Sequence, residues 1–320
     1  MEKIKIGKKF SGERIDKSLV EILKSFGINI PSRSFLKNLK GGKVLINGEV
    51  VKRSYKLKEG DVLEIDKEAF ENGLKEVDLS ISIVSQKKDL EIIYEDSNYM
   101  VLNKKKGMVV HPGVGNRKNT LANYIRGYLE EKQEYDSLVD RAGIVHRLDK
   151  GVSGLMVVAK KKEMQEFLKK QFQTHTVEKL YKMQTKKFKE SELDMLEIVK
   201  DFSLENGLKI DKKWLTVKGY IGRSRSNRIR MVFKAYDFGG SKFAISHFLR
   251  IEKDTFLVKI DTGRMHQIRA TLFYLGRYIL GDSLYTPGSR IFTPNSIDLE
   301  SVYLSFKDLS GKKKVFNILK

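Results

Sequence analysis

The chain has 320 residues, of which 40% are hydrophobic and 10% aromatic, enough apolar material for two packed domains and too much for a chain that is disordered throughout. It carries 62 lysines and arginines against 41 acids, a net charge of +21, which favours a polyanionic partner such as nucleic acid, with a lysine-rich background composition as the alternative explanation. The absence of cysteine excludes disulfides and thiolate chemistry, and the absence of a signal peptide or a run of roughly 18 apolar residues predicts a cytoplasmic protein with no membrane partner.

The segment 13–66 predicts a small unit with the order helix, helix, strand, strand, strand. Apolar side chains recur at helical spacing over 15–26 and again over 35–39. Asn47-Gly48 is the strongest short-range signal for a β-hairpin. An alternating strand over 62–66 completes the unit.

The second predicted helix carries four cations on one face, namely Arg33, Lys37, Lys40 and Lys43, with no acid between them. A solvated helix face is the alternative to an RNA-binding one. The order of the elements and the run PSRSFLKNLKGGKVLINGEVV resemble an S4 RNA-binding domain over 13–66. That resemblance implies that the four cations contact RNA.

A polar segment over 67–87 is interpreted as a linker, and 88–320 as a second, larger domain. Runs of strands with few helices between them predict an α+β fold with a mixed or antiparallel sheet. Strands are expected over 90–94, 99–103, 108–111 and 154–159, and helices over 161–172 and 265–275.

Several familiar sites are absent from the sequence. The five histidines occur singly, without the i, i+4 pair that holds zinc, so we expect no metal. There is no P-loop, and no glycine-rich loop opens a helix after a strand, so we expect no nucleotide cofactor. An RNA methyltransferase is disfavoured for the same reason.

One loop segment, GIVHRLDKGVSGLMVVAK over 143–160, places Asp149 directly before a buried strand. A carboxylate held beside a rigid strand suits a nucleophile or a general base. A loop aspartate is, however, more commonly a turn former. Spacing alone leaves both interpretations open.

The residues "HRLD" followed by "SGLMVVAK" resemble the signature of the RluA family of pseudouridine synthases, and among them the RluD-like enzymes of the large ribosomal subunit. Further stretches that agree in order lie over 107–116, 171–182, 221–231 and 261–285. The resemblance implies a pseudouridine synthase catalytic domain, an isomerase that acts on RNA without a cofactor and that we expect to be a monomer. Large-subunit ribosomal RNA is the expected substrate, with transfer RNA as the alternative.

The resemblance also implies roles for four residues. Asp149 matches the catalytic aspartate, and Arg269 matches the arginine that pairs with it. Tyr181 matches the tyrosine that stacks on the target base and is a candidate to take the proton from C5. Arg147 matches an arginine that holds the place of the flipped-out nucleotide in the RNA. Whether Asp149 attacks ribose C1′, adds to the uracil ring or acts as a base stays open, and an inactive scaffold that assists ribosome assembly is the competing function.

The sequence departs from the family pattern at four places. Gly151-Val152 replace the usual Asp-Thr, Ala270-Thr271 replace Val-His, and Arg277-Tyr278 replace His-Pro. The family's C-terminal Leu-His-Ala stretch is not evident, and LESVYLSF over 299–306 stands near its place. None of these changes removes the aspartate, the tyrosine or the arginine. They bear on the RNA target more than on the reaction.

Overall fold

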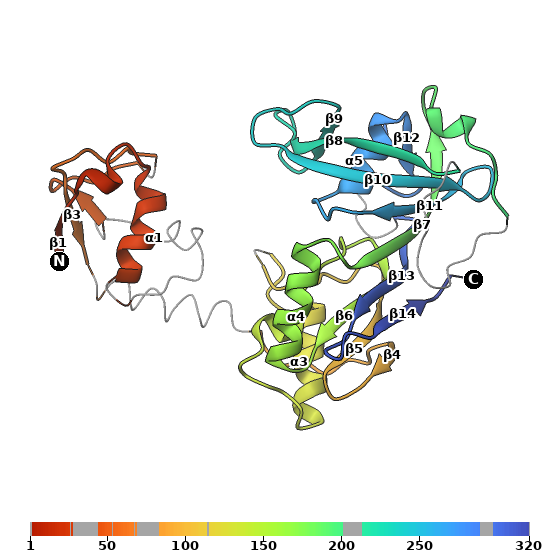
Figure 1. Ribbon diagram of the computed structural model, residues 1–320, viewed down its shortest axis with the longest axis horizontal. Coiled ribbons are helices and arrows are strands. Elements are labelled where there is room, and N and C mark those ends of the chain that lie inside the picture. Colours follow the sequence, from red (N-terminus) through yellow and green to blue (C-terminus); the bar gives the residue numbers. More distant parts are fainter. Residues whose placement is uncertain are drawn as a thin grey trace. The chain divides into compact units, whose positions relative to one another are not determined.

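The structure is a computed structural model, shown in Figure 1. It describes residues 2–25, 27, 44–52, 54–66, 68, 83–113, 115–200, 213–288 and 297–319. The chain divides into two units, Met1–Ser82 and Ile83–Lys320. Each unit is described by itself.

Among its described residues, the first unit packs one helix against a three-stranded antiparallel sheet. The order in the sheet is β1-β3-β2. Its elements are β1 (Glu2–Lys5), the 3-10 turn η1 (Lys8–Phe10), α1 (Ile15–Ser25), β2 (Val44–Ile46) and β3 (Val62–Ile65). The apolar face of α1 lies in one cluster with the inward side chains of β2 and β3, and the helix ends, as predicted, before Gly27 with its φ of 76°.

The predicted turn at Asn47-Gly48 forms with both residues in the left-handed region, at φ 53° and 78°. The prediction of a paired strand after that turn is wrong, because residues 50–52 are irregular and β2 pairs with β3 instead. The second predicted helix, and with it Arg33, Lys37, Lys40 and Lys43, lies outside the described residues.

The second unit is built around one large mixed sheet of eleven described strands. The strands are β4 (Ile92–Glu95), β5 (Tyr99–Lys104), β6 (Ser153–Ala159), β7 (Glu178–Lys187), β8 (Leu215–Arg223), β9 (Met231–Lys234), β10 (Lys242–Arg250), β11 (Thr255–Ile260), β12 (Arg277–Ile279), β13 (Leu299–Lys307) and β14 (Lys313–Asn317). The helices are α3 (Leu121–Glu131), α4 (Lys162–Gln173) and α5 (Gln267–Tyr274), with 3-10 turns η3 (Asp140–Gly143) and η4 (Glu192–Met195).

The strand order is β4-β5-β6-β13-β7-β11-β10-β8-β9, with β12 on β7 and β14 on β13. Every described pair is antiparallel except β6 with β13. This arrangement confirms the α+β class and the mixed sheet predicted from the sequence.

The parallel contact between β6 and β13 requires a glycine. Gly154 has φ 116° and faces Ser301, and a Cβ at this position would lie 2.3 Å from the Ser301 carbonyl oxygen. The two strands can therefore approach closely just after the loop that carries Asp149.

The strand predicted over 108–111 is wrong. Val109 forms only an isolated bridge with Thr120. The carbonyl groups of Val109 and Val110 accept the backbone N–H groups of Leu121 and Ala122, at 2.8 and 3.0 Å. These donors begin α3, a helix that was not predicted, and the first N–H groups of a helix need acceptors from outside it.

The boundary between the units falls inside the segment 67–87 that was interpreted as a linker. Residues 83–87 pack on α3: Gln86 accepts the backbone N–H of Asn119, and the Asn123 amide donates to the Val84 carbonyl at 2.7 Å. A Cβ on Gly127 would lie 2.2 Å from the Gln86 carbonyl oxygen. The second unit therefore begins at Ile83.

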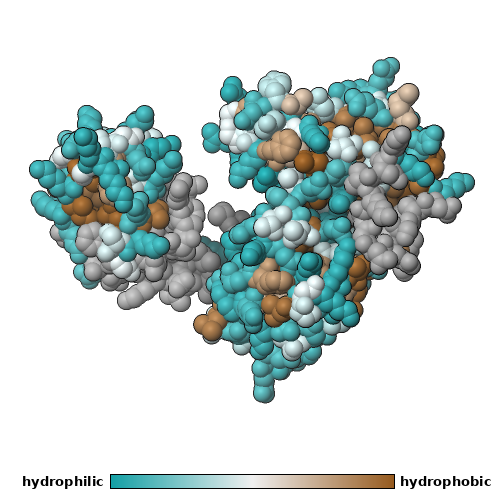
Figure 2. All heavy atoms as spheres, in the orientation of Figure 1, coloured by the Kyte–Doolittle hydropathy of each residue, from teal (hydrophilic) through white to brown (hydrophobic). Residues whose placement is uncertain are grey.

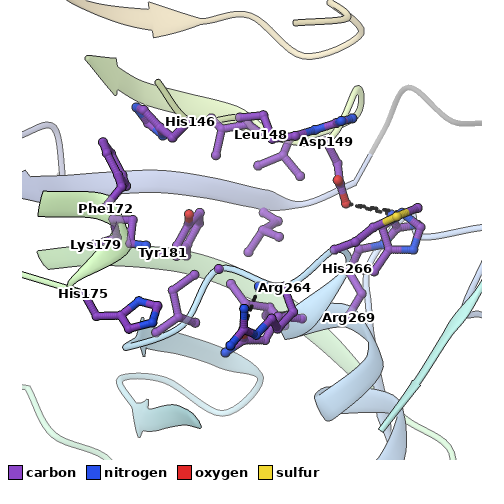
Figure 3. A pocket seen from close by; sticks show the side chains of 18 of the residues that line it. His146, Leu148, Asp149, Phe172, His175, Lys179, Tyr181, Arg264, His266 and Arg269 are labelled. Carbon is purple, nitrogen blue, oxygen red and sulfur yellow. Dashed lines mark hydrogen bonds and ion pairs between the residues drawn. The ribbon is translucent and has the colours of Figure 1, made fainter. Parts of the chain in front are cut away.

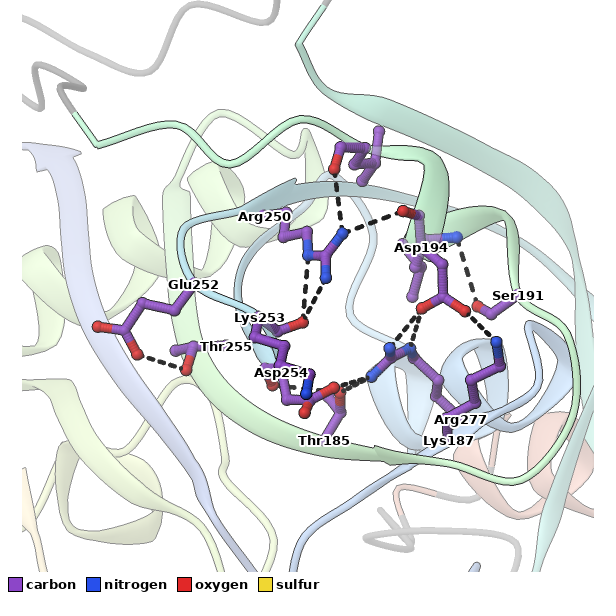
Figure 4. Close-up of polar contacts among 12 residues, drawn as sticks. Thr185, Lys187, Ser191, Asp194, Arg250, Glu252, Lys253, Asp254, Thr255 and Arg277 are labelled. Atoms are coloured by element: carbon purple, nitrogen blue, oxygen red, sulfur yellow. Dashed lines mark hydrogen bonds and ion pairs between the residues drawn. The ribbon is translucent and has the colours of Figure 1, made fainter.

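Arg277, at one of the departures from the family pattern, is buried in an ionic network (Figure 4). Its guanidinium pairs with Asp194 after β7 and with Asp254 in the β10–β11 turn, and donates to Thr185 at 2.8 Å. The substituted residue thus ties β12 to the neighbouring strands.

On the face drawn in Figure 2, hydrophilic residues predominate among the described residues of both units. No helix within the described ranges is long and apolar enough to cross a membrane.

Candidate active site

A cavity of about 570 Å³ opens in the second unit (Figure 3). Its walls come from four places: the loop 145–152 before β6, the strand β7 with the end of α4, the segment 260–269 that leads from β11 into α5, and Leu299 at the start of β13. Asp149, Tyr181, Arg269 and Arg147, the four residues assigned from the sequence in this domain, all line it.

Arg269 holds two carboxylates with one guanidinium. Its Nη1 donates to Asp149 at 2.9 Å, while Nε and Nη2 donate to the two oxygens of Asp282 at 2.7 and 2.8 Å. Burial works against the Arg269 cation, but the bonds and charges of these two acids hold its pKa above the ordinary value. The side chain of Asp149 keeps 25% of its surface exposed, whereas that of Asp282 is buried. Asp149 is therefore the carboxylate that a substrate can reach.

A second group approaches Asp149 from the start of α5. His266 has φ 53°, in the left-handed region, and its Nε2 lies 3.7 Å from the Asp149 carboxylate. Its Nδ1 lies 3.3 Å from the Tyr285 hydroxyl. Burial lowers the pKa of His266, although Asp149 opposes that change, so the imidazole is neutral near neutral pH.

A buried lysine, Lys104, is hydrogen-bonded to the backbone of the loop that carries Asp149. The Lys104 ammonium donates to the carbonyl groups of Met108 and Lys150, at 3.0 and 3.4 Å. Burial lowers the pKa of Lys104 to about 8, and the charge of Asp149 opposes the decrease.

The same loop is also held by Val152. The Val152 N–H donates to the Asp149 carbonyl at 3.1 Å, and the Val152 side chain packs in the core. At this departure from the family pattern, Val152 thus closes the turn through its backbone and anchors the loop in the core through its side chain.

Tyr181 projects from the middle of β7 and is 7% exposed. Burial, and then the charge of Asp149, raise the pKa of its hydroxyl, so the phenol stays protonated near neutral pH. Arg147, in contrast, is exposed at the cavity wall. The site thus combines an accessible carboxylate, an aromatic face and an exposed cation.

Asp282 and His266 were not assigned from the sequence. Both stand inside stretches that carry the family resemblance, MHQIR and LGDSLY, so their presence there was the available signal. Their roles depend on the turn into α5 and on the loop after β12, which no local pattern reveals. Within the described residues, no group of three or more histidines or acids has the arrangement of a metal site.

The family model described as RNA pseudouridylate synthase matches residues 98–273, and that of the S4 domain matches residues 13–63. The ribosomal large subunit pseudouridine synthase D of Vibrio vulnificus is 32% identical over 302 residues, which cover 92% of this chain and 79% of that protein. An uncharacterized RNA pseudouridine synthase of Bacillus subtilis is 32% identical over 284 residues, covering 87% of this chain and 81% of that protein.

Two solved structures show the same fold. Human RNA pseudouridylate synthase domain containing 1 aligns with a TM-score of 0.52 and 20% identity, over 72% of this chain and 84% of that chain. Human RNA pseudouridylate synthase domain containing 4 aligns with a TM-score of 0.51 and 19% identity, over 72% of this chain and 88% of that chain. With the family match and the 32% identity over most of the chain, these findings establish that the chain belongs to the RNA pseudouridylate synthases, isomerases that act on RNA, and that it carries an S4 domain before the family's own domain.

Proposed function

We propose that this chain converts specific uridines of large-subunit ribosomal RNA to pseudouridine, with Asp149 as the catalytic carboxylate. The observation that carries the proposal is the position of the accessible Asp149 side chain at the cavity wall. Arg269 binds this carboxylate, and the remaining guanidinium N–H groups of Arg269 bind the buried Asp282. The relatives named for the large ribosomal subunit support the choice of RNA. Transfer RNA is the alternative substrate that the test below separates.

The reaction is an isomerisation, so the site needs no redox partner or group donor. The C1′–N1 bond breaks, the uracil rotates, and C5 bonds to C1′. Asp149 can assist by attack on C1′, by addition to the ring or as a base, and all three routes require a carboxylate that faces the nucleotide. Because the raised pKa keeps the Tyr181 hydroxyl protonated, we assign Tyr181 to stacking on the base.

The target base must leave its stack to reach this cavity, which costs a few kcal/mol. We propose that Arg147, exposed at the rim, occupies the place the base leaves. We further propose that the S4-like unit over 13–66 binds RNA through Arg33, Lys37, Lys40 and Lys43. We propose that the enzyme acts as a monomer, and a ribosomal substrate would place it in the cytoplasm.

The proposal is tested by tritium release from RNA labelled at C5 of uridine. The wild-type protein should release tritium from large-subunit ribosomal RNA and not from transfer RNA. Asp149→Asn keeps the size and removes the charge, so its rate should fall at least about a thousandfold, while RNA affinity changes less than about twofold because the phosphate-binding cations remain.

Glu163→Gln, on the exposed face of α4, is the matched control and should keep the wild-type rate. The proposal fails if the wild-type protein releases no tritium from either RNA. It also fails if the Asp149→Asn variant retains a rate within tenfold of wild type.

A further inference from the structure

The end of the cavity remote from Asp149 carries a lysine. Lys179 lies two residues before Tyr181 on β7, so both side chains project from the same face of the strand. Both line the cavity, and Figure 3 shows Tyr181 between Lys179 and Asp149. A flat ligand on Tyr181 therefore has one edge toward the carboxylate and the other toward the ammonium.

The Lys179 side chain is largely buried, and its ammonium has no hydrogen-bond acceptor among the described residues. The residue is 9% exposed, and its Nζ lies 5.6 Å from the centre of the Phe172 ring. The negative charge of Asp261 favours the Lys179 cation, but the Asp261 carboxylate is already hydrogen-bonded to the His247 ring, at 2.9 Å. Burial lowers the pKa of Lys179 to about 8, as expected for a cation that lacks a close partner.

An ammonium group can only donate hydrogen bonds, so the missing partner is an acceptor. Uracil presents the acceptor O4 at the edge opposite its glycosidic nitrogen, where cytosine presents an amino group, which is a donor. A base stacked on Tyr181 with its ribose toward Asp149 would direct that edge to Lys179. This step rests on the proposed function of the site.

We propose that Lys179 binds O4 of the target uracil, and so selects uridine over cytidine and stabilises the negative charge that the uracil gains during the reaction. When the C1′–N1 bond breaks, its electron pair leaves with the uracil, and the charge spreads onto O2 and O4. When C5 bonds to C1′ that pair returns to the new bond, and the proton lost from C5 is balanced by one gained at N1. A cation already in place at O4 stabilises the charged intermediate more than it stabilises the neutral substrate.

The test uses the full-length protein and an RNA whose modified uridine has been mapped. Lys179→Met keeps the volume and removes the charge, and its single-turnover rate of tritium release should fall by about 10²- to 10³-fold. Base selection is measured by binding in the Asp149→Asn background, where uridine is not converted. There, RNA with uridine at the target should bind about ten- to a hundredfold more tightly than RNA with cytidine, and adding Lys179→Met should remove most of that difference.

Two further variants keep the test decisive. Lys186→Met changes an exposed lysine on the same strand and should leave both the rate and the selection unchanged. Lys179→Gln supplies an amide oxygen that can accept from cytosine, so it should raise the affinity for the cytidine RNA even if the Met variant does not fold.

The proposal is overturned if Lys179→Met keeps the wild-type rate. It is also overturned if Lys179→Met weakens uridine and cytidine RNA equally, which would identify a phosphate contact instead. In either case the wild-type protein still forms pseudouridine, so this failure is distinct from a failure of the proposed function, in which no tritium is released at all.

Discussion

Arg269 determines where the Asp149 carboxylate lies, and Asp282 determines where Arg269 lies. Asp282 is buried and accepts the N–H groups of Leu284 and Tyr285, at 3.1 and 3.3 Å. Its two oxygens take two of the guanidinium nitrogens and leave Nη1 for Asp149. The fork geometry of arginine makes this possible, and lysine could not reproduce it.

Removal of the Arg269 charge should affect stability and activity in separable ways. Arg269→Met leaves Asp282 buried without a cation, which should lower the free energy of unfolding by about 3–5 kcal/mol, as measured by urea denaturation. The rate of tritium release should fall as well, because Asp149 loses the group that orients it.

The double variant Arg269→Met with Asp282→Asn distinguishes these two effects. The second substitution replaces the uncompensated carboxylate with a neutral amide, so the double variant should recover part of the lost stability but none of the lost rate. If the rate recovers along with the stability, the pairing of Arg269 with Asp149 has no part in catalysis.

Three residues that were predicted from the sequence, Asp149, Tyr181 and Arg269, line one cavity in the structure. Asp149 and Arg269 are 120 residues apart in the chain. Motifs with a family resemblance indicated them. Lys179 and Asp282 also lie in stretches that resemble family motifs, but their roles needed the structure, because only the folded chain shows that the Asp282 carboxylate is buried against Arg269 and that the Lys179 ammonium has no acceptor among the described residues.

Glu95, at the end of β4, is the centre of an ionic cluster that joins the sheet to α3. It is mostly buried, with 16% of its side chain exposed. Its carboxylate accepts hydrogen bonds at 2.7, 2.8 and 2.9 Å from Tyr128, Lys132 and Lys160. Burial alone would raise the pKa of Glu95, but these partners lower it to about 2.

This cluster makes stability depend on pH in a defined direction. The folded pKa of Glu95 lies below the ordinary value of 4.5, so its contribution is complete above pH 4.5 and is lost as the pH falls toward 2. The contribution amounts to about 3 kcal/mol. Urea denaturation at pH 7 and at pH 3 should therefore show that Glu95→Gln reduces the loss of stability on acidification.

Glu91→Gln, at an exposed position just before the same strand, serves as the control and should keep the wild-type pH dependence. If Glu95→Gln and wild type lose equal stability between the two pH values, the cluster contributes nothing to folding.

The secondary structure was predictable where the local pattern and the tertiary environment agree. The apolar run that becomes β6 and the amphipathic segment that becomes α4 form close to the expected residues. The prediction failed at Val109 and Val110, whose β-branched side chains favour a strand. Their carbonyl groups instead serve the first turn of α3, and such a long-range requirement overrides propensity.

Across the whole molecule, the two units have separate cores. One hydrophobic cluster, from Ile6 to Ile65, holds only residues of the first unit, and the four clusters of the second unit hold only described residues from Ile83 onward. The fold class, the S4 match over 13–63 and the family match over 98–273 were all foreseeable from the sequence. The boundary at Ile83 was not, because residues 83–87 are largely polar yet pack on α3.

Deletion of residues 1–82 should leave the second unit folded and weaken its binding of RNA. Residues 1–66 carry 15 lysines and arginines against 9 acids. Each phosphate contact contributes roughly 0.7–0.9 to the slope of log affinity against log salt. We expect the four cations of the second predicted helix, Arg33 to Lys43, to make about two to four such contacts. The slope should therefore flatten by about 1.5–3.5 units, measured by titration of labelled ribosomal RNA fragments at several salt concentrations.

The full-length variant Arg33→Ala with Lys37→Ala and Lys40→Ala tests the same surface without the deletion and should reproduce most of the flattening. An unchanged salt slope in both proteins would count against an RNA-binding role for this unit, and a cooperative thermal transition of the truncated protein verifies that the second unit folds alone.

The position of β13 at the centre of the sheet has a consequence for when the enzyme becomes active. All the other strands on the main path, β4 to β11, precede it in the sequence, yet β13 is the strand that joins β6 to β7. During synthesis, the part that carries the Asp149 loop and the part that carries Tyr181 and Arg269 therefore emerge as separate halves of a sheet. They can be joined only after residues 299–307 have been made, so a nascent chain contains all three of these side chains well before it contains an assembled site. Activity should thus appear late and abruptly as the chain grows.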